Sequence, residues 1–272
     1  MTAPQQAPVP EFSSDCSRCL GLCCVLLPFS AAAGFGADKA GGEACGHLRA
    51  DDRCGIHDRL REEGWPGCTV FECFGAGQQV SQVTYAGGGW RDRDGDQRAE
   101  MAAVFSVMRV LHEMLAHLSE VERRTPDPAA TALRTELAAH TALDPVSLLG
   151  LDVDDLHDRV GPALVAASRR IRSRRGAALD HADLAGRDLR RRRLAEADLR
   201  GALLIAADLR GLDLGRADLL GADLRDADVR GANLSATLFL TQPQVNAAVG
   251  DAGTTLPPAL AVPGHWRVPG RS

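Results

Sequence analysis

Apolar side chains recur at helical spacing in the middle of the chain. Between Ala99 and Arg124 they fall three or four residues apart, which places them on one face of an amphipathic helix, and two prolines follow closely. Further helical stretches are predicted near residues 129–143 and 145–174, the first with Asp127 as its N-cap. Residues 99–175 therefore form a predicted helical segment. The apolar positions of its first helix are Met101, Val104, Phe105, Met108, Leu111, Leu115 and Leu118.

Beyond Gly176 the apolar period changes to five residues. Apolar centres follow one strict register, and an alanine usually stands two residues before each centre. Self-similarity at a fixed period is typical of a solenoid, in which each repeat packs on its neighbours. Residues 176–241 are therefore predicted to form one repeat domain. Its centres are Leu179, Leu184, Leu189, Leu194, Leu199, Leu204, Leu209, Leu214, Leu219, Leu224, Val229, Leu234 and Phe239.

These repeats resemble the pentapeptide-repeat family, as in Ala197-Asp198-Leu199-Arg200-Gly201. The resemblance implies a right-handed quadrilateral β-helix, in which each pentapeptide forms one side and twenty residues form one coil. Residues twenty apart should then stack at roughly 4.8 Å. We expect one arginine column and one parallel aspartate column on the same face, with Glu196 beneath Arg216. The columns are Arg190, Arg210 and Arg230, beside Asp188, Asp208 and Asp228.

The repeat domain departs from the regular pattern at two positions and needs a cap at each end. Arg187 and Arg192 occupy positions where the family places a small inward residue, and a buried unpaired guanidinium is costly. We expect a distorted first coil with both arginines pointing outward; a pocket or docking notch is the alternative. A solenoid also needs caps. The helical segment is expected to cap the first coil, and residues 242–272 form a C-terminal cap and tail in which Trp266 covers the last coil.

All eight cysteines lie between Cys16 and Cys73. Two thiolates separated by two residues can bind one soft cation from a single turn, and four complete a tetrahedral zinc site or hold an iron–sulfur cluster. Residues 12–98 are therefore predicted to form a cysteine-rich metal-binding domain. The predicted ligands are Cys16, Cys19, Cys23, Cys24, Cys45, Cys54, Cys68 and Cys73, with His47 and His57 as further candidates.

A disulfide framework is the alternative for these cysteines. Adjacent Cys23 and Cys24 cannot comfortably bridge each other, because their Cα atoms lie about 3.8 Å apart. Residues 12–80 also resemble the family of zinc- or iron-chelating proteins named for a CxxCxxCC motif, although three residues, Leu20-Gly21-Leu22, stand where that name specifies two. The resemblance implies zinc or iron and leaves the choice, and the grouping of the ligands, open.

Other polar clusters fit known sites less well. A zinc-protease helix carries its second histidine four residues after the first, whereas His117 follows His112 by five. The acidic segment 92–96 lacks the glycine and glutamate positions of a calcium loop. The basic zone of Arg169, Arg170, Arg172, Arg174, Arg175 and residues 190–193 could bind nucleic acid or acidic lipid, but we favour pairing with aspartates and with a helix C-terminus.

Composition and charge narrow the function classes. The chain has 272 residues, 45% of them apolar, and a net charge of −5, which does not point to nucleic acid. The polar segment 1–11 is a predicted disordered tail without the positive charge of a secretion signal. The most apolar window, Leu20–Phe29, is too short to span a bilayer. We expect a cytoplasmic protein with reduced thiols and no transmembrane helix.

Three functions remain open. The first is a metal-binding module joined to an interaction scaffold that binds another protein through the β-helix faces. The second is an iron- or zinc-dependent metalloenzyme or oxidoreductase. The candidates near its metal are Glu72, His47, His57, His112 and the aspartates of the 92–96 loop. The third, implied by the pentapeptide-repeat resemblance, is a DNA mimic that regulates a topoisomerase. The third is the least favoured, because residues 177–241 hold eleven acidic and ten basic side chains instead of a dense negative surface. The pattern predicts no oligomeric state.

Overall fold

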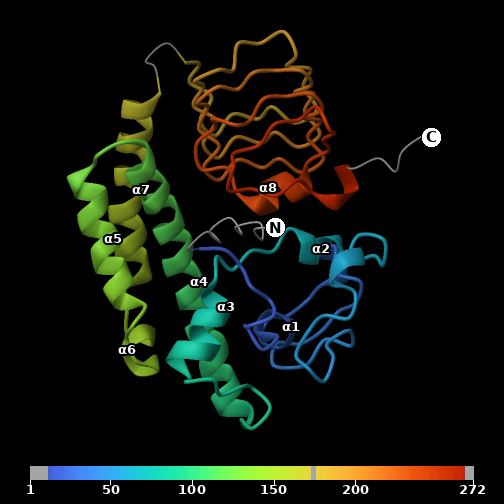
Figure 1. The fold of residues 1–272 in the computed structure, drawn as a ribbon, viewed down its shortest axis with the longest axis vertical. Helices are drawn as coiled ribbons and strands as arrows, with labels where there is room; N and C mark the ends of the chain where they lie inside the picture. Colours follow the sequence, from blue (N-terminus) through green and yellow to red (C-terminus); the bar gives the residue numbers. More distant parts are fainter. Residues whose placement is uncertain (1–11, 173–175, 267–272) are drawn as a thin grey trace, which may run out of the picture. The chain divides into compact units, whose positions relative to one another are not determined.

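The computed structural model describes residues 12–172 and 176–266 (Figure 1). The predicted disordered tail, residues 1–11, lies outside the described residues, as does the end of the predicted C-terminal tail. The described chain divides into two compact units. Unit 1 combines the described part of Met1–Pro66 with Cys73–Glu122 and Pro128–Gly161; unit 2 combines Gly67–Glu72, Arg123–Asp127 and the described residues from Pro162 onward.

The elements of the described chain are short except in its middle. The α-helices are α1 (Leu22–Leu26), α2 (Pro66–Thr69), α3 (Ala76–Gln79), α4 (Gly95–Arg124), α5 (Pro128–His140), α6 (Pro145–Leu149), α7 (Val153–Ile171) and α8 (Gln242–Ala247). The tighter or wider helical turns are η1 (Ala31–Ala33), η2 (His57–Arg59), η3 (Val80–Thr84) and η4 (Gly264–Trp266).

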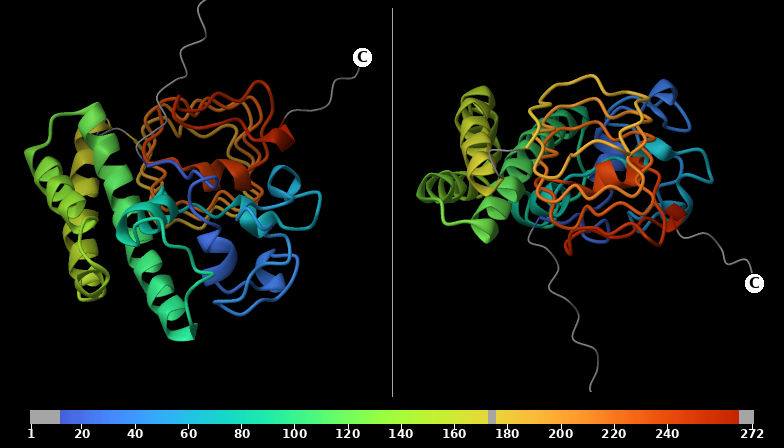
Figure 2. Two further views of the ribbon diagram at one scale, coloured as in Figure 1. Left: turned by 60° about the horizontal axis from the view of Figure 1, so that its bottom comes forward. Right: turned by 90° about the horizontal axis from the view of Figure 1, so that it is seen from above.

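The predicted helical segment is present. The apolar face of α4 is buried at all seven positions named from the sequence. Helices α4, α5 and the first part of α7 lie side by side (Figures 1 and 2). Ion pairs link their polar faces, from Arg134 to Glu122 at 2.6 Å and from Arg159 to Glu136 at 2.5 Å.

The stretch predicted as one helix over 145–174 contains two helices, α6 and α7. The Asp144 carboxylate accepts hydrogen bonds from the backbone N–H groups of Val146 and Ser147 and so starts α6. Gly150 ends α6, and Asp152 accepts from the N–H of Asp155 at the start of α7. Two local caps close together in the sequence therefore divide the helical pattern.

Helix α4 is long and apolar enough to cross a membrane by length and composition. Of its apolar window, 56% is buried inside the described structure, and a core helix passes the same test. The helix therefore does not establish a membrane span.

The repeats form a four-sided β-helix in unit 2. Backbone bridges join residues twenty apart in parallel, as in Ala178 to Asp198, Asp198 to Asp218 and Asp218 to Leu238. The stacked coils share a four-sided outline when seen from above (Figure 2, right). Each bridge is isolated, because a side of five residues turns before a longer strand can form. The leucine centres and the alanines beside them make one buried core.

The charged columns lie as predicted. Arg190 is 2.8 Å from Asp188 in its own coil and 3.2 Å from Asp208 in the next coil. The same pairing recurs one coil further on, where Arg210 contacts Asp208 at 2.6 Å and Asp228 at 3.6 Å. Each like-charged ladder is therefore offset by its opposite. The predicted contact of Arg216 with Glu196 is present at 2.9 Å.

The first coil is irregular at its fourth side, as predicted. Arg187 and Arg192 are both exposed. At Arg187 the backbone hydrogen bonding between the first two coils is kept, since the Arg187 carbonyl accepts from the N–H of Asp208 at 2.9 Å. Around Arg192 no bridge joins the first two coils, among the described residues, at the position that would continue the column after the Asp188–Asp208 bridge. Both guanidinium groups thus avoid the axis.

The C-terminal segment extends the solenoid after a detour. Thr241 and Gln244 form a capping box that starts α8, which takes the place of one side of the coil. The chain then returns to the stack, where Val249 bridges to Asp228 and Thr255 bridges to Asn233. Each of these two bridges spans slightly more of the chain than a regular coil does.

Trp266 closes the last coil, as the sequence predicts. Its side chain is 2% exposed and packs in the repeat core. Its indole N–H donates to the carbonyl of Ala248 at 3.0 Å. A Cβ on Gly250 would stand 2.5 Å from the indole ring, so only glycine fits beneath it.

Neighbouring leucines test the buried axis. Leu204 is fully buried, whereas Leu203 points outward and is 42% exposed. We expect Leu204→Ala to lower the free energy of unfolding by about 2–5 kcal/mol, because it leaves a cavity in the axis. Leu203→Ala should cost less than about 1 kcal/mol. Denaturant unfolding of the two variants measures both values, and equal losses would contradict this orientation.

Candidate metal centre

All eight cysteines lie among the described residues, and none of them forms a disulfide there. Seven of them belong to unit 1, and the eighth, Cys68, belongs to unit 2 in the α2 segment. Asn246 fixes this segment within unit 2 by donating to the carbonyl of Thr69 at 2.6 Å. Cys68 is therefore grouped apart from the other seven predicted ligands.

Helix α1 carries the adjacent pair Cys23 and Cys24. Gly21 precedes the helix with a left-handed φ of 68°, and a Cβ there would lie 2.7 Å from the side chain of Leu48. The two sulfur atoms of the pair are 3.9 Å apart. Two thiolates bound to one tetrahedral zinc ion, with Zn–S near 2.3 Å, stand roughly 3.8 Å apart. The pair already has the spacing of shared ligands.

A short hairpin brings two more cysteines toward this pair. The Cys45 N–H donates to the Cys24 carbonyl at 2.9 Å. Cys54 then forms an antiparallel bridge with Leu48, which closely follows Cys45 in the chain. Cys24 and Cys45 act on Cys54 electrostatically and, with burial as the larger cause, raise the pKa of its thiol. Cys24, Cys45 and Cys54 are therefore neighbours in the fold, although they lie far apart in the sequence.

The remaining cysteines of unit 1 form a second group. The Cys19 thiol donates to the Cys16 carbonyl at 3.6 Å. Gly77 packs between Cys19 and Cys73, since a Cβ on this glycine would lie 3.8 Å and 3.7 Å from their sulfur atoms. The sulfur of Cys73 is 3.0 Å from the hydroxyl oxygen of Ser14. Cys16, Cys19 and Cys73 thus gather from the two ends of the cysteine-rich sequence.

Hydrogen bonds between thiols polarise each pair. The bond with Cys16 lowers the pKa of Cys19 to about 7, and the same bond raises the pKa of Cys16. The bond with Cys23 likewise lowers the pKa of Cys24 and raises that of Cys23. One sulfur in each pair is therefore the readier thiolate, which is the form that binds metals.

Lys39, the only lysine of the chain, is fixed beside the α1 pair. Its ammonium group donates to the carbonyls of Val25 and Leu27, at 3.0 and 2.6 Å, and to those of Ala40 and Glu43. Burial lowers the pKa of Lys39, and the charges of Cys45, Cys24 and Cys23 act in the opposite direction. The ammonium thus joins the C-terminal end of α1 to the loop that follows Lys39. Sequence reasoning assigned it no role, and its singularity was the available signal.

The donor set fits a thiophilic metal ion in its chemistry and in the spacing of the α1 pair. Within residues 12–172 and 176–266, however, no three Cys, His, Asp or Glu side chains converge closely enough to hold a metal ion. Cys16 and Cys19 of the second group act electrostatically on Cys23 of the first, but in the described part of the chain the two groups form no closed coordination sphere. The eight predicted ligands accordingly stay a prediction.

The histidines named from the sequence have other contacts. The ring of His47 packs edge-on against Trp65, with centroids 5.1 Å apart, and His57 starts η2. His112 is buried on α4, where its Nδ1 lies 2.8 Å from the carbonyl oxygen of Phe74. Burial lowers the pKa of His117 to about 4, so this ring is neutral at pH 7. His112 and His117 thus behave as core residues.

The acidic residues proposed for an enzyme are dispersed. Asp94 caps α4 by accepting from the N–H of Gln97 at 2.9 Å, which confirms a turn in the 92–96 loop. Glu72 belongs to unit 2, whereas Asp94 and seven of the thiols belong to unit 1. The fold therefore does not gather these acidic residues in one unit.

A second polar cluster lies in unit 2, where Arg172 of the basic zone pairs with an aspartate beside the end of α7, as the sequence predicts. The C-terminal part of α7 lies against one side of the β-helix, where Ser168 donates a hydrogen bond to Asp218. Arg172 donates to the Ser168 hydroxyl at 2.9 Å and to Asp198 at 2.9 Å. Arg200 donates to both oxygens of Asp198, at 2.7 and 2.8 Å. Asp218 has no exposed surface, and this burial raises the pKa of its carboxyl.

A known protein is similar to this one over nearly the whole chain. YybG of Bacillus subtilis (strain 168), described as an uncharacterized protein, is 47% identical over 94% of this chain and 95% of its own length. The chain belongs to the YybG family. Residues 175–211 and 202–239 match the family described as Pentapeptide repeats, in 8 copies. This YybG-family chain therefore carries a pentapeptide-repeat domain, as the five-residue period predicts, while the match does not extend to the cysteine-rich part.

Solved pentapeptide-repeat proteins are similar to part of this YybG-family protein. Rfr23 from the cyanobacterium Cyanothece 51142 is 31% identical over 29% of this chain, with a TM-score of 0.20. A pentapeptide-repeat protein from the thylakoid lumen of Arabidopsis thaliana is 29% identical over 32% of this chain, with a TM-score of 0.15. The chain spans 47% and 63% of their respective lengths.

The buried carboxyl of Asp218 predicts a pH effect on stability. Because its folded pKa is raised, the folded state holds this proton more tightly than the unfolded state does, and its contribution to stability falls as pH rises above about 4. Asp218→Asn keeps the shape and cannot ionise. We expect the melting temperature of this variant, relative to the wild type, to rise between pH 4 and pH 7. A constant difference across that range would contradict the assignment.

Proposed function

We propose that this protein is a cytoplasmic metal-binding module joined to a pentapeptide-repeat interaction scaffold. The metal is zinc or iron, either as single ions or as an iron–sulfur cluster, held by the thiols of unit 1. Its role is structural or regulatory. The observation that carries the proposal is the gathering of seven cysteines without disulfides in one unit, with the Cys23 and Cys24 sulfurs 3.9 Å apart.

The short elements of unit 1 support a structural role for the metal. Helix α1 has five residues, η1 and η2 have three each, and the described loops between them contain single bridges such as Phe29 to Lys39. A fold with so little regular structure has few backbone hydrogen bonds to stabilise it. A four-thiolate metal site would supply cross-links in their place. Cysteines drawn from positions 16 to 73 would tie the segment together at several points.

The repeat domain supports a role in protein interaction. Its coils present rigid outer sides, and one of them exposes the apolar side chain of Leu203 between polar rows. The acidic residues on another side are neutralised within the protein, since Asp208 and Asp228 each contact arginines of two coils. A DNA mimic requires uncompensated negative charge at phosphate spacing. These ladders therefore favour a protein partner over DNA mimicry.

Metal analysis tests the first half of the proposal. We expect protein purified without oxygen to contain one or two thiophilic metal ions per chain by elemental analysis, with visible absorption only if iron–sulfur is present. The double variant Cys23→Ser, Cys24→Ser should lose at least half of this metal. Ser30→Ala, an exposed change in the same domain, is the control. Metal-free protein with its cysteines oxidised in pairs would refute the metal-binding module.

Lys39 provides a separate test through charge. A four-thiolate zinc centre carries a net negative charge, and a fixed ammonium group nearby offsets it. We expect Lys39→Met to lose metal to a chelator about tenfold faster than the wild type, whereas Lys39→Arg retains the charge and most of the protection. Absorbance of the released metal–chelator complex gives both rates. Identical rates for the methionine variant and the wild type would contradict a role of the Lys39 charge in holding the metal.

A further inference from the structure

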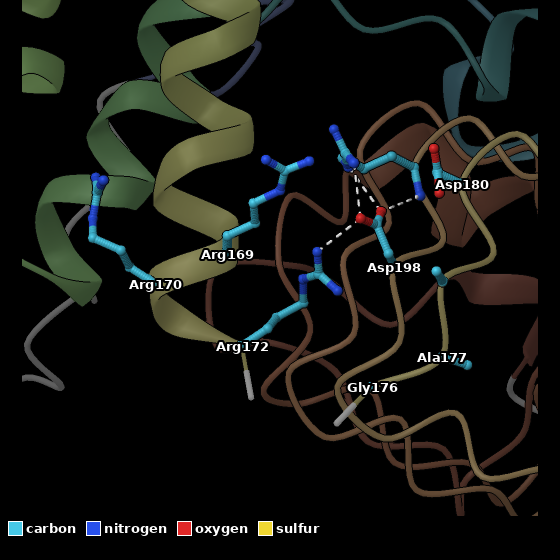
Figure 3. Close-up of a pocket in the computed structure, with 9 residues that line it drawn as sticks. Arg169, Arg170, Arg172, Gly176, Ala177, Asp180 and Asp198 are labelled. Carbon is cyan, nitrogen blue, oxygen red and sulfur yellow. Dashed lines mark hydrogen bonds and ion pairs between the residues drawn. The ribbon is translucent and has the colours of Figure 1, made fainter. Parts of the chain in front are cut away.

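A pocket of about 770 Å³ lies within unit 2, between the end of α7 and the first two coils of the β-helix. Arginine dominates its polar lining. Figure 3 shows Arg169 on the side of α7 that faces Asp198, whereas Arg170 lies on the other side of the helix. The charged lining residues are Arg169, Arg170, Arg172, Arg200, Asp180 and Asp198.

The pocket lining has more arginines than carboxylates to pair with them. Arg170 pairs with Asp127, which is not part of the lining. Asp198 alone accepts from both Arg172 and Arg200. Among the residues that the structure describes, no ion pair or hydrogen bond joins the Arg169 side chain to a partner.

Neighbouring acidic residues do not neutralise this excess of positive charge. Asp218 stands behind Asp198 with no exposed surface; its carboxylate accepts from Ser168 and from the N–H of Leu220, and it lies 3.6 Å from the Arg200 Nε. Asp180 is exposed and acts on Arg200 only through its charge. The guanidinium of Arg169 therefore faces the pocket without a carboxylate of its own.

Two of the arginines are fixed in advance of any ligand. The Arg172 side chain is 8% exposed and donates to Ser168, to the carbonyl of Glu196 and to Asp198. The Arg200 side chain is 16% exposed, and its Nε and one terminal nitrogen contact Asp198. A ligand in the pocket therefore meets, besides Arg169, two guanidinium groups whose rotamers are already ordered, which lowers the entropic cost of binding.

We propose that this pocket binds the phosphate group of a small phosphorylated molecule, with Arg169 as its principal ligand and Arg200 as the second. Planar guanidinium groups donate paired N–H bonds that match phosphate oxygens. A concave site of this volume is in the range of small-molecule pockets. A nucleic acid or a membrane surface would instead require an extended basic stripe, and the outer arginine column at Arg190, Arg210 and Arg230 is neutralised by its aspartates.

Titration calorimetry of the full chain at low ionic strength tests this site with inorganic phosphate and pyrophosphate as probes. Arg169 is exposed on α7, so Arg169→Gln should leave the fold intact, which thermal melting verifies. We expect this variant to weaken pyrophosphate binding by about tenfold or more, the value of a lost charged hydrogen bond. Arg225→Gln is the control, because Arg225 pairs with Asp223 on another side of the β-helix and carries the same charge.

A second variant moves the affinity the other way. Asp180→Asn removes a negative charge from the lining and should tighten pyrophosphate binding. The proposal is overturned if neither probe binds in the millimolar range, or if Arg169→Gln and Arg225→Gln weaken binding equally, which would indicate a diffuse charge effect. Sedimentation with phosphatidylglycerol vesicles forms the last arm. Binding to vesicles that depends on Arg169, without binding of the soluble probes, would assign the site to a lipid headgroup and overturn the small-molecule proposal.

Discussion

Filling the axis of a four-sided coil with one apolar side chain per five residues is the constraint on which the repeat domain depends. Leucines such as Leu204 and Leu209 are fully buried only when the next coil stacks in register. That register aligns backbone N–H and carbonyl groups of successive coils, as between Leu204 and Asp223. It also stacks identical outer residues. An exposed aspartate column is therefore stable only beside a column of arginines, which the sequence supplies at Arg190, Arg210 and Arg230.

This logic explains which parts of the fold could be predicted from the sequence. A period of five fixes the partner of every residue by arithmetic, so the contact of Glu196 with Arg216 follows without any structure. The prediction loses its basis where the period stops. The stack resumes after α8 at Val249 with a longer spacing than a regular coil, because the capping box of Thr241 and Gln244 starts a helix in place of a coil side. No repeat pattern encodes that return.

The cysteine-rich part has no comparable rule. Its spacing identifies the donor type, yet the neighbours of Cys24 are set by a hairpin whose closing bridge joins Leu48 to Cys54. Single bridges of this kind leave no periodic signal. Lys39 shows the same limit, since its four carbonyl partners lie at positions 25, 27, 40 and 43, and only the folded loop brings them together. The sequence therefore predicts the type of metal ligand, whereas the tertiary structure decides which cysteines become neighbours.

The same tripeptide, aspartate-leucine-arginine, has different surroundings on different sides of the coil. At Asp208 the aspartate is solvated and its own arginine neutralises it, which lowers the pKa of the carboxyl. At Asp198 the end of α7 covers the side, so Arg172 joins Arg200 on one carboxylate, and desolvation opposes the lowering of its pKa. Asp218 in the next coil has leucine where Asp198 has Arg200, and its pKa is raised by burial. A repeat thus fixes geometry, while the helix beside it decides which charges are left without a partner.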